Sequence, residues 1–170
     1  GFSIQKVALL VAPIAAIVGA FSGVMGGKIA DAVSKRYGIH AQSWLVAVLK
    51  CLALPFTFLF FLTDSPTIAV VAYAFQYLFA SSYLGPTFAL IQGLAPLRMR
   101  ALWAAVTLLV INMIGLGLGP LGIGIISDML RPSLGEESLR WAMVMMAGLT
   151  PWAIFHYWRA GVLLKRQAMA

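Results

Sequence analysis

The chain has 170 residues, of which 62% are hydrophobic and only 10% are charged. A water-soluble domain carries about 25% charged residues, so this chain could not cover its surface in water, and we expect an all-α integral membrane protein. The net charge of +7 does not indicate nucleic acid as a partner. The bases stand at the ends of apolar runs, where they set topology and contact membrane lipids. With Cys51 as the only cysteine, neither a disulfide within the chain nor a Cys-based metal site is expected, and no cofactor is predicted.

Five apolar runs are long enough to cross a bilayer as helices, which takes about 20 residues each. They are too long, and alternate too little between polar and apolar residues, to be strands of a membrane barrel. The sequence therefore predicts five transmembrane helices. Their expected ranges are 4–26, 42–62, 67–94, 101–127 and 139–159.

Basic residues concentrate in the loops expected at 27–41 and 95–100 and in the tail at 160–170, whereas the acids stand mostly at the other helix ends. The positive-inside rule places these loops and the C-terminus in the cytoplasm. Five spans then place Gly1 on the outside. Because the chain begins there without a methionine or a signal peptide, we expect it to be a piece of a longer protein.

The third span carries polar and aromatic side chains on one helical face and beside it. Such groups within a membrane face other protein segments or a water-filled cavity. Two interpretations stay open, namely hydrogen bonding between helices and a pathway for an amphipathic small-molecule substrate. With one residue of the fourth span, the pathway candidates are Tyr73, Gln76, Tyr77, Ser81, Tyr83, Thr87 and Asn112.

Small residues mark several helix contacts and bends. The first span has a stripe of alanine and glycine, and the fourth contains the run "GLGLGPLGIG". A partner helix can approach such stripes closely, and proline bends a helix. Static packing and conformational exchange both explain these features. The hinge and packing candidates are Gly85, Pro86, Gly115, Gly119, Pro120 and Gly122.

Lys50 lies about one-third of the way into the second span. We expect its long stem to reach toward the cytoplasmic face, with a substrate or counter-ion role as the alternative. No Asp or Glu lies inside any predicted span, so the chain offers no proton carrier. The sequence also contains no catalytic motif, and an enzyme is not expected.

The stretch "GGKIADAVSKR" resembles the loop signature of the major facilitator superfamily, Gly-x-x-x-Asp-x-x-x-basic-basic. The matching residues are Gly27, Asp31, Lys35 and Arg36. The run from Pro86 to Asp128 most resembles the second half of spinster-like members. This copy of the signature departs from the family where Ala32 and Ser34 replace the usual arginine and glycine.

The resemblance implies that the chain is helices eight to twelve of a twelve-helix transporter, a partial six-helix bundle whose partner is a missing N-terminal half. In such a protein Asp31 would attract a helix N-terminus of that half, and the third and fourth spans would line the cavity. The implied activity is alternating-access transport of a small amphipathic or lipid-like solute in a cell membrane of the bacterial inner type. Drug or metabolite efflux and a non-transporting scaffold remain alternatives.

Overall fold

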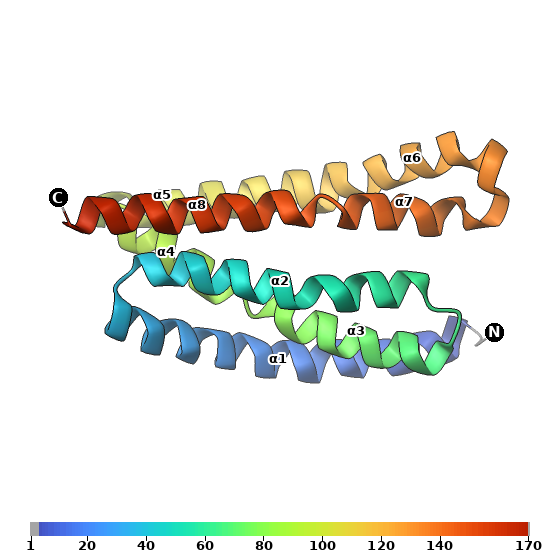
Figure 1. Ribbon diagram of the computed structural model, residues 1–170, viewed down its shortest axis with the longest axis horizontal. Coiled ribbons are helices and arrows are strands. Elements are labelled where there is room, and N and C mark those ends of the chain that lie inside the picture. The colour runs from blue at the N-terminus through green and yellow to red at the C-terminus, as the bar shows by residue number, and fades with distance from the viewer. Residues whose placement is uncertain (1–3, 170) are drawn as a thin grey trace. The chain divides into compact units, whose positions relative to one another are not determined.

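The computed structural model describes residues 4–169, with the side chains of Leu9 and of residues 11–169. All regular structure in this part of the chain is helical (Figure 1). The chain divides into two compact units. One contains the chain up to Leu90 and from Thr150 onward, and the other is Ile91–Leu149. Long apolar helices without strands among the described residues confirm the all-α membrane class.

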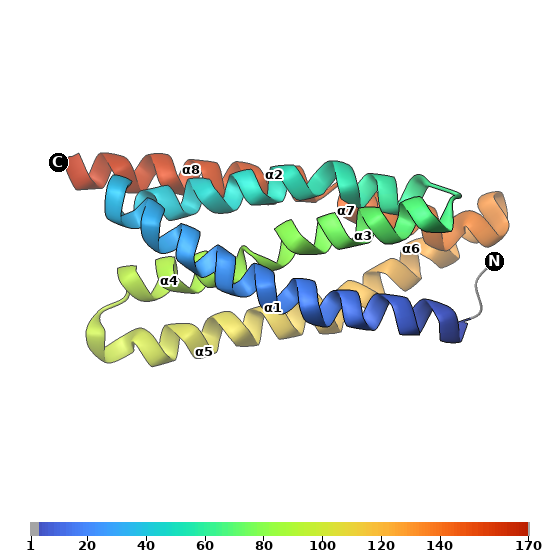
Figure 2. The same ribbon diagram turned by 90° about the horizontal axis from the view of Figure 1, so that it is seen from below.

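In the first unit, α2 packs against α8 on one side and against α3 on the other, and α3 also packs on α1 (Figure 2). The last residues of α4 already belong to the second unit. The helices are α1 (Ile4–Tyr37), α2 (His40–Leu62), α3 (Pro66–Ser81), α4 (Leu84–Leu94) and α8 (Thr150–Met169).

Helix α1 ends at Tyr37 rather than at Gly26, so most of the loop expected at 27–41 is helical. The charged residues of this stretch stand on a helix that continues beyond the apolar run. It ends at Gly38, which has φ 89° and whose N–H donates to the carbonyl of Ser34 at 2.8 Å. Glycine is the residue that adopts this left-handed conformation at no steric cost.

Between α3 and α4 the helix is interrupted at Ser82 and Tyr83. Pro86 follows in the first turn of α4. The N–H groups of a first turn have no partner within the helix, so the N–H that proline lacks costs no helical hydrogen bond. The single third span expected at 67–94 is therefore two helices joined by a short break.

The second unit is a helical hairpin in which α6 packs on α7. Gly135, with φ 54°, reverses the chain between them. The hydroxyls of Ser127 and Ser138 lie 3.3 Å apart beside this turn. The elements are η1 (Leu97–Met99), α5 (Arg100–Val110), η2 (Ile111–Leu118), α6 (Gly119–Leu134), η3 (Gly135–Glu137) and α7 (Ser138–Ala147).

The expected count of five spanning helices is wrong for the described residues, which contain four stretches long and apolar enough to cross a membrane. Three are Val11–Tyr37, His40–Leu62 and Pro66–Leu94. The fourth, Leu97–Met169, has 73 residues and takes in both of the last two predicted spans. A straight helix of that length would measure about 110 Å, and the reversal at Gly135 is made by a short helical turn instead of an extended loop. The helical hydrogen bonding therefore continues where the sequence predicted a separation.

Candidate functional site

Lys50 provides a cation inside the first unit. Its Nζ lies 3.8 Å from the centroid of the Tyr83 ring, and the side chain is half-buried. At 1.5 Å per residue, Lys50 lies about 15 Å along α2 from His40, which is about half the thickness of a bilayer core. The extension toward the cytoplasmic face stays a prediction, and the contact that the structure shows is with Tyr83. The ammonium is held over an aromatic face, an interaction worth about 2 kcal/mol when water is excluded.

Three hydroxyl-bearing residues tie α8 to α2 and α4. The Thr87 Oγ1 and Tyr157 Oη atoms lie 3.1 Å apart, and Ser43 Oγ donates to the Tyr157 carbonyl at 2.6 Å. The Thr87 and Ser43 side chains are buried. Tyr157 also lies close enough to Tyr83 for the two groups to interact electrostatically. We call Lys50, Ser43, Tyr83, Thr87 and Tyr157 the mid-span cluster.

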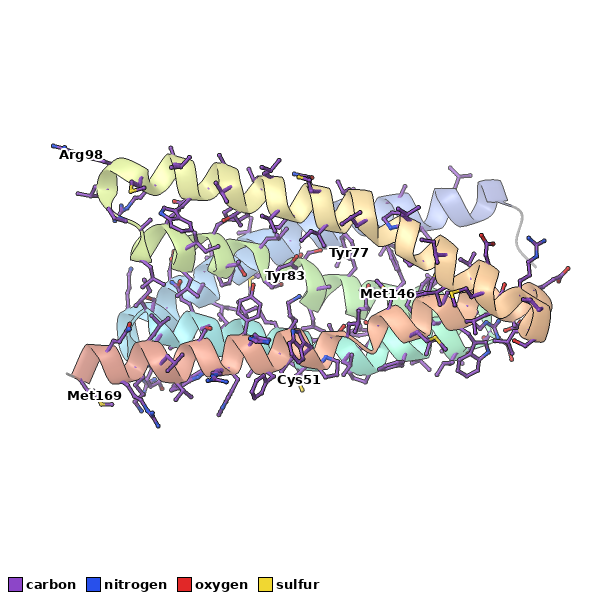
Figure 3. The ribbon with its side chains drawn as sticks, turned by 90° about the horizontal axis from the view of Figure 1, so that it is seen from above. Cys51, Tyr77, Tyr83, Arg98, Met146 and Met169 are labelled. Atoms are coloured by element: carbon purple, nitrogen blue, oxygen red, sulfur yellow. The ribbon has the colours of Figure 1, made fainter. Side chains whose placement is uncertain are left out.

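The predicted pathway face is divided between two places. Tyr77 belongs to α3, and Tyr83 lies at the junction with α4 (Figure 3). The rings of Tyr73 and Tyr77 stack at 5.6 Å, and Tyr73 also contacts Phe60 of α2 at 5.7 Å. Tyr73 and Tyr77 belong to α3, whereas Tyr83 lies in the break after α3 and Thr87 belongs to α4. Both Gln76 and Ser81, the other α3 candidates, are half-buried.

Helix α1 crosses the α3–α4 junction at very short range. A Cβ atom added to Gly26 would overlap the carbonyl oxygen of Ser82, and one added to Gly85 would lie 3.7 Å from the Gly27 Cα. At the same crossing, Ser82 Oγ donates to the Ser22 carbonyl at 3.2 Å. A Cβ on Gly19 would lie 3.0 Å from the Tyr77 ring. These glycines of the α1 stripe therefore support close static packing.

The remaining signature residues lie on the exposed surface of the last turns of α1. Asp31, Lys35 and Arg36 are all exposed. Among the residues that the structure describes, the Asp31 carboxylate makes no ion pair or hydrogen bond. Arg36 places its guanidinium carbon 5.3 Å from the ring centroid of Tyr37. The signature thus leaves a charged helix end available for contacts outside the described chain.

The glycine-rich run in the second unit forms a π-helical turn, η2, before Pro120. The Gly119 N–H donates to the carbonyl of Ile114, five residues earlier. This wider turn accommodates a proline, which cannot donate to the carbonyl four residues before it. Asn112 is exposed and donates to the Leu108 carbonyl of its own helix at 2.8 Å, so it joins no cluster.

The glycines around this turn differ from those of α1. A Cβ atom added to Gly115 or Gly122 would meet no atom of another described segment within 4 Å. No partner for these two glycines is therefore found within the second unit.

The mid-span cluster combines one cation with hydroxyls in hydrocarbon surroundings, which suits binding of a polar headgroup and offers no nucleophile–base pair for catalysis. No group of His, Cys, Asp or Glu among the described residues could hold a metal ion. Sequence analysis missed Tyr157, because its partner face continues to Gly161, which was assigned to the tail and not to the last span. That glycine is buried beneath Trp44, which marks the face as a helix contact.

One curated relative supports a membrane transporter. The chain is 30% identical over 149 residues to a protein named MFS-type efflux pump from Mycolicibacterium smegmatis. The match covers 85% of this chain and 34% of the relative, so the chain spans about a third of that protein's length. No family model and no solved structure matches the chain. The similarity supports membership of the major facilitator superfamily and a transporter of that type, and with the long apolar helices it indicates a membrane location.

Proposed function

We propose that the chain is the C-terminal half of a secondary transporter of the major facilitator superfamily, corresponding to helices eight to twelve, and that it belongs to a spinster-like group. The proposal rests on the likeness to an efflux pump and on the signature at the end of α1. The transporter moves a small amphipathic or lipid-like solute by exposing a midplane site to each side of the membrane in turn.

The observation that supports this class of substrate is the position of the Lys50 ammonium, which lies over the ring of Tyr83 within the span. A cation in a membrane interior is costly and marks functional sites more often than packing. Neither α2, α3, α4 nor α8 contains an Asp or Glu that could neutralise it. A solute with an acidic headgroup would supply the missing negative charge, and the hydroxyls of Thr87 and Tyr157 would accept or donate hydrogen bonds to the same group.

The missing N-terminal half is the proposed partner. The small-residue face of Gly115 and Gly122 would receive one of its helices, because small residues let helices approach where lipid gives no hydrophobic drive. Asp31 would interact with the positive end of a helix dipole in that half. Its exposed carboxylate leaves it available for this contact.

Transport assays with charge-altered variants test this proposal. The full-length protein in liposomes would be offered amphipathic solutes that share one hydrocarbon chain and carry acidic, neutral or basic headgroups. We expect Lys50→Gln to raise the KM for the acidic solute about tenfold or more, because about 1.4 kcal/mol of lost interaction is a factor of ten, and to change neutral solutes little. Lys50→Arg should keep most of the preference, since it keeps the charge.

The neighbouring, exposed Cys51 offers a matched control, and Cys51→Ser should leave transport unchanged. If Lys50→Gln reduced the transport of all solutes equally, the lysine would have a packing role and the charged site would be refuted. Absence of gradient-driven transport of every solute by the wild-type protein would favour the scaffold alternative. Selective transport of neutral or basic drugs would favour the drug-efflux alternative.

A further inference from the structure

A groove of about 620 Å³ opens at the end of the first unit where α1 stops, α2 begins and α8 approaches its last turns. Its walls come from all three helices. In Figure 1 the end of α1, the start of α2 and the end of α8 lie at the same end of this unit. The groove is separate from the mid-span cluster, and no residue is shared between them.

The outer part of the groove is basic and aromatic. Arg36, His40 and Lys165 line it, each beside an aromatic ring. The Lys165 Nζ lies 5.6 Å from the ring centroid of Trp44, and His40 meets the same ring edge-on at 5.2 Å. The described lining contains no acidic side chain. Positive charge is therefore concentrated here without internal neutralisation.

Trp44 is fixed in place and gives the groove a firm wall. Its Nε1 donates to the carbonyl of Trp158 at 3.2 Å, and its ring lies directly on Gly161 of α8. A side chain at position 161 would overlap the ring, so the glycine is required for this packing. The two indole rings of Trp44 and Trp158 approach to 5.8 Å. The groove between α2 and α8 is thus built by specific packing rather than left by loose contact.

The inner part of the groove is apolar, with Val33, Leu45 and Val48 in its lining. The start of α2 adjoins the basic part and has no acidic residue in its first turn, so the positive end of its helix dipole adds to the positive charge there. A site with cations and an aromatic rim at one end and hydrocarbon at the other lies where a helix bundle meets the lipid headgroups.

We propose that this groove binds the phosphate of an anionic phospholipid, with Arg36 and Lys165 on the phosphate and the apolar wall against the first carbons of an acyl chain. Free phosphate shares the headgroup chemistry, but it would leave the apolar wall unused. The inference does not depend on the transported solute, because the groove is distinct from the mid-span cluster.

Two pairs of neighbouring bases make a matched test. Arg36 and Lys165 line the groove, whereas Lys35 and Arg166, next to them in the chain, do not. The full-length protein would be purified in detergent, and binding of phosphatidylglycerol and phosphatidylcholine measured by native mass spectrometry. We expect the Arg36→Gln/Lys165→Gln variant to lose about 25-fold in phosphatidylglycerol affinity, roughly fivefold per base, with little change for phosphatidylcholine. The Lys35→Gln/Arg166→Gln variant should lose about twofold or less.

Equal losses in the two double variants would show a diffuse basic surface and overturn the site. Displacement of the lipid by millimolar glycerol phosphate would assign the groove to a free phosphate ligand and overturn the lipid assignment. Val48→Asn offers a second, uncharged variant at the apolar wall, where Val48 is half-exposed. It should weaken phosphatidylglycerol binding without weakening glycerol phosphate binding, and the melting temperature of each variant verifies folding.

Discussion

The two units use glycine in opposite ways. In the first unit, Gly26 of α1 lies directly against the Ser82 backbone, and Gly19 accommodates the Tyr77 ring. In the second unit, Gly115 and Gly122 meet no other segment of that unit. The same sequence pattern of small residues therefore marks a completed helix contact in one unit and an unfilled one in the other.

The filled stripe should affect the stability of its own unit, whereas the open stripe should affect assembly with another helix. A filled stripe contributes packing to its own unit, because each added atom would displace a neighbour. An open stripe contributes no such packing, and its glycines cost the helix about 1 kcal/mol each relative to alanine. Retaining them makes physical sense where another helix approaches. Substitutions in the two stripes should consequently have effects of opposite sign on stability.

The largest expected effect is at the filled stripe. Gly26→Ala places a Cβ on the carbonyl of Ser82, and backbone cannot move aside as a flexible side chain can. We expect the variant to lose about 2 kcal/mol or more of unfolding free energy, near the upper end for overpacked sites. Thermal unfolding in detergent and the yield in the membrane would both report the loss.

Gly23→Ala is the matched control on the same helix, since a Cβ there meets nothing within 4 Å. It should leave the protein as stable as the wild type or stabilise it by up to about 1 kcal/mol. Similar destabilisation in Gly23→Ala and Gly26→Ala would mean that the stripe acts through helix flexibility and not through the close crossing.

At the open stripe, Gly122→Leu should leave unfolding unchanged or raise the melting temperature if no helix packs there, because leucine is the better helix former. If the proposed partner helix fills the groove, the same change should reduce transport at least tenfold at normal expression. Gly124→Leu is the control, because two residues turn a helix by about 200° and place the side chain on another face. Wild-type transport in Gly122→Leu would identify the groove as lipid-facing.

Helix type and approximate span positions could be read from the sequence because they depend on local composition. The exceptions have local causes as well. Charged residues after Gly27 predicted a loop, yet no residue there disfavours a helix until Gly38, and the helix continues past the apolar run. The reversal at Gly135 uses a short helical turn, so two predicted spans became one continuous helical stretch.

The site residues could be predicted only in part, because their partners are distant in the sequence. Tyr83 and Thr87 were identified as polar groups within a span, but the contacts of Tyr83 with Lys50 and of Thr87 with Tyr157 were not. These contacts depend on how separate helices pack together. No periodicity in a single helix contains that information.

The smallest expected effect tests whether close approach or hydrogen bonding holds α1 on the α3–α4 junction. Ser82 Oγ donates its one hydrogen to two acceptors, the Ser22 carbonyl at 3.2 Å and the Leu78 carbonyl at 2.7 Å. Because the shorter bond is within its own helix, Ser82→Ala removes only part of an interhelical hydrogen bond. Such bonds average about 0.6 kcal/mol within membranes, so we expect a loss of that size or less.

Both Ser82→Ala and Gly26→Ala act at the same crossing, so melting both variants under one condition compares the two contributions directly. If Ser82→Ala lost as much unfolding free energy as Gly26→Ala, the hydrogen bond would be what holds the two segments together at the crossing. A much smaller loss would show that the close approach permitted by Gly26 holds them together. The second outcome follows from the geometry, since the backbones are already in contact there without the hydroxyl.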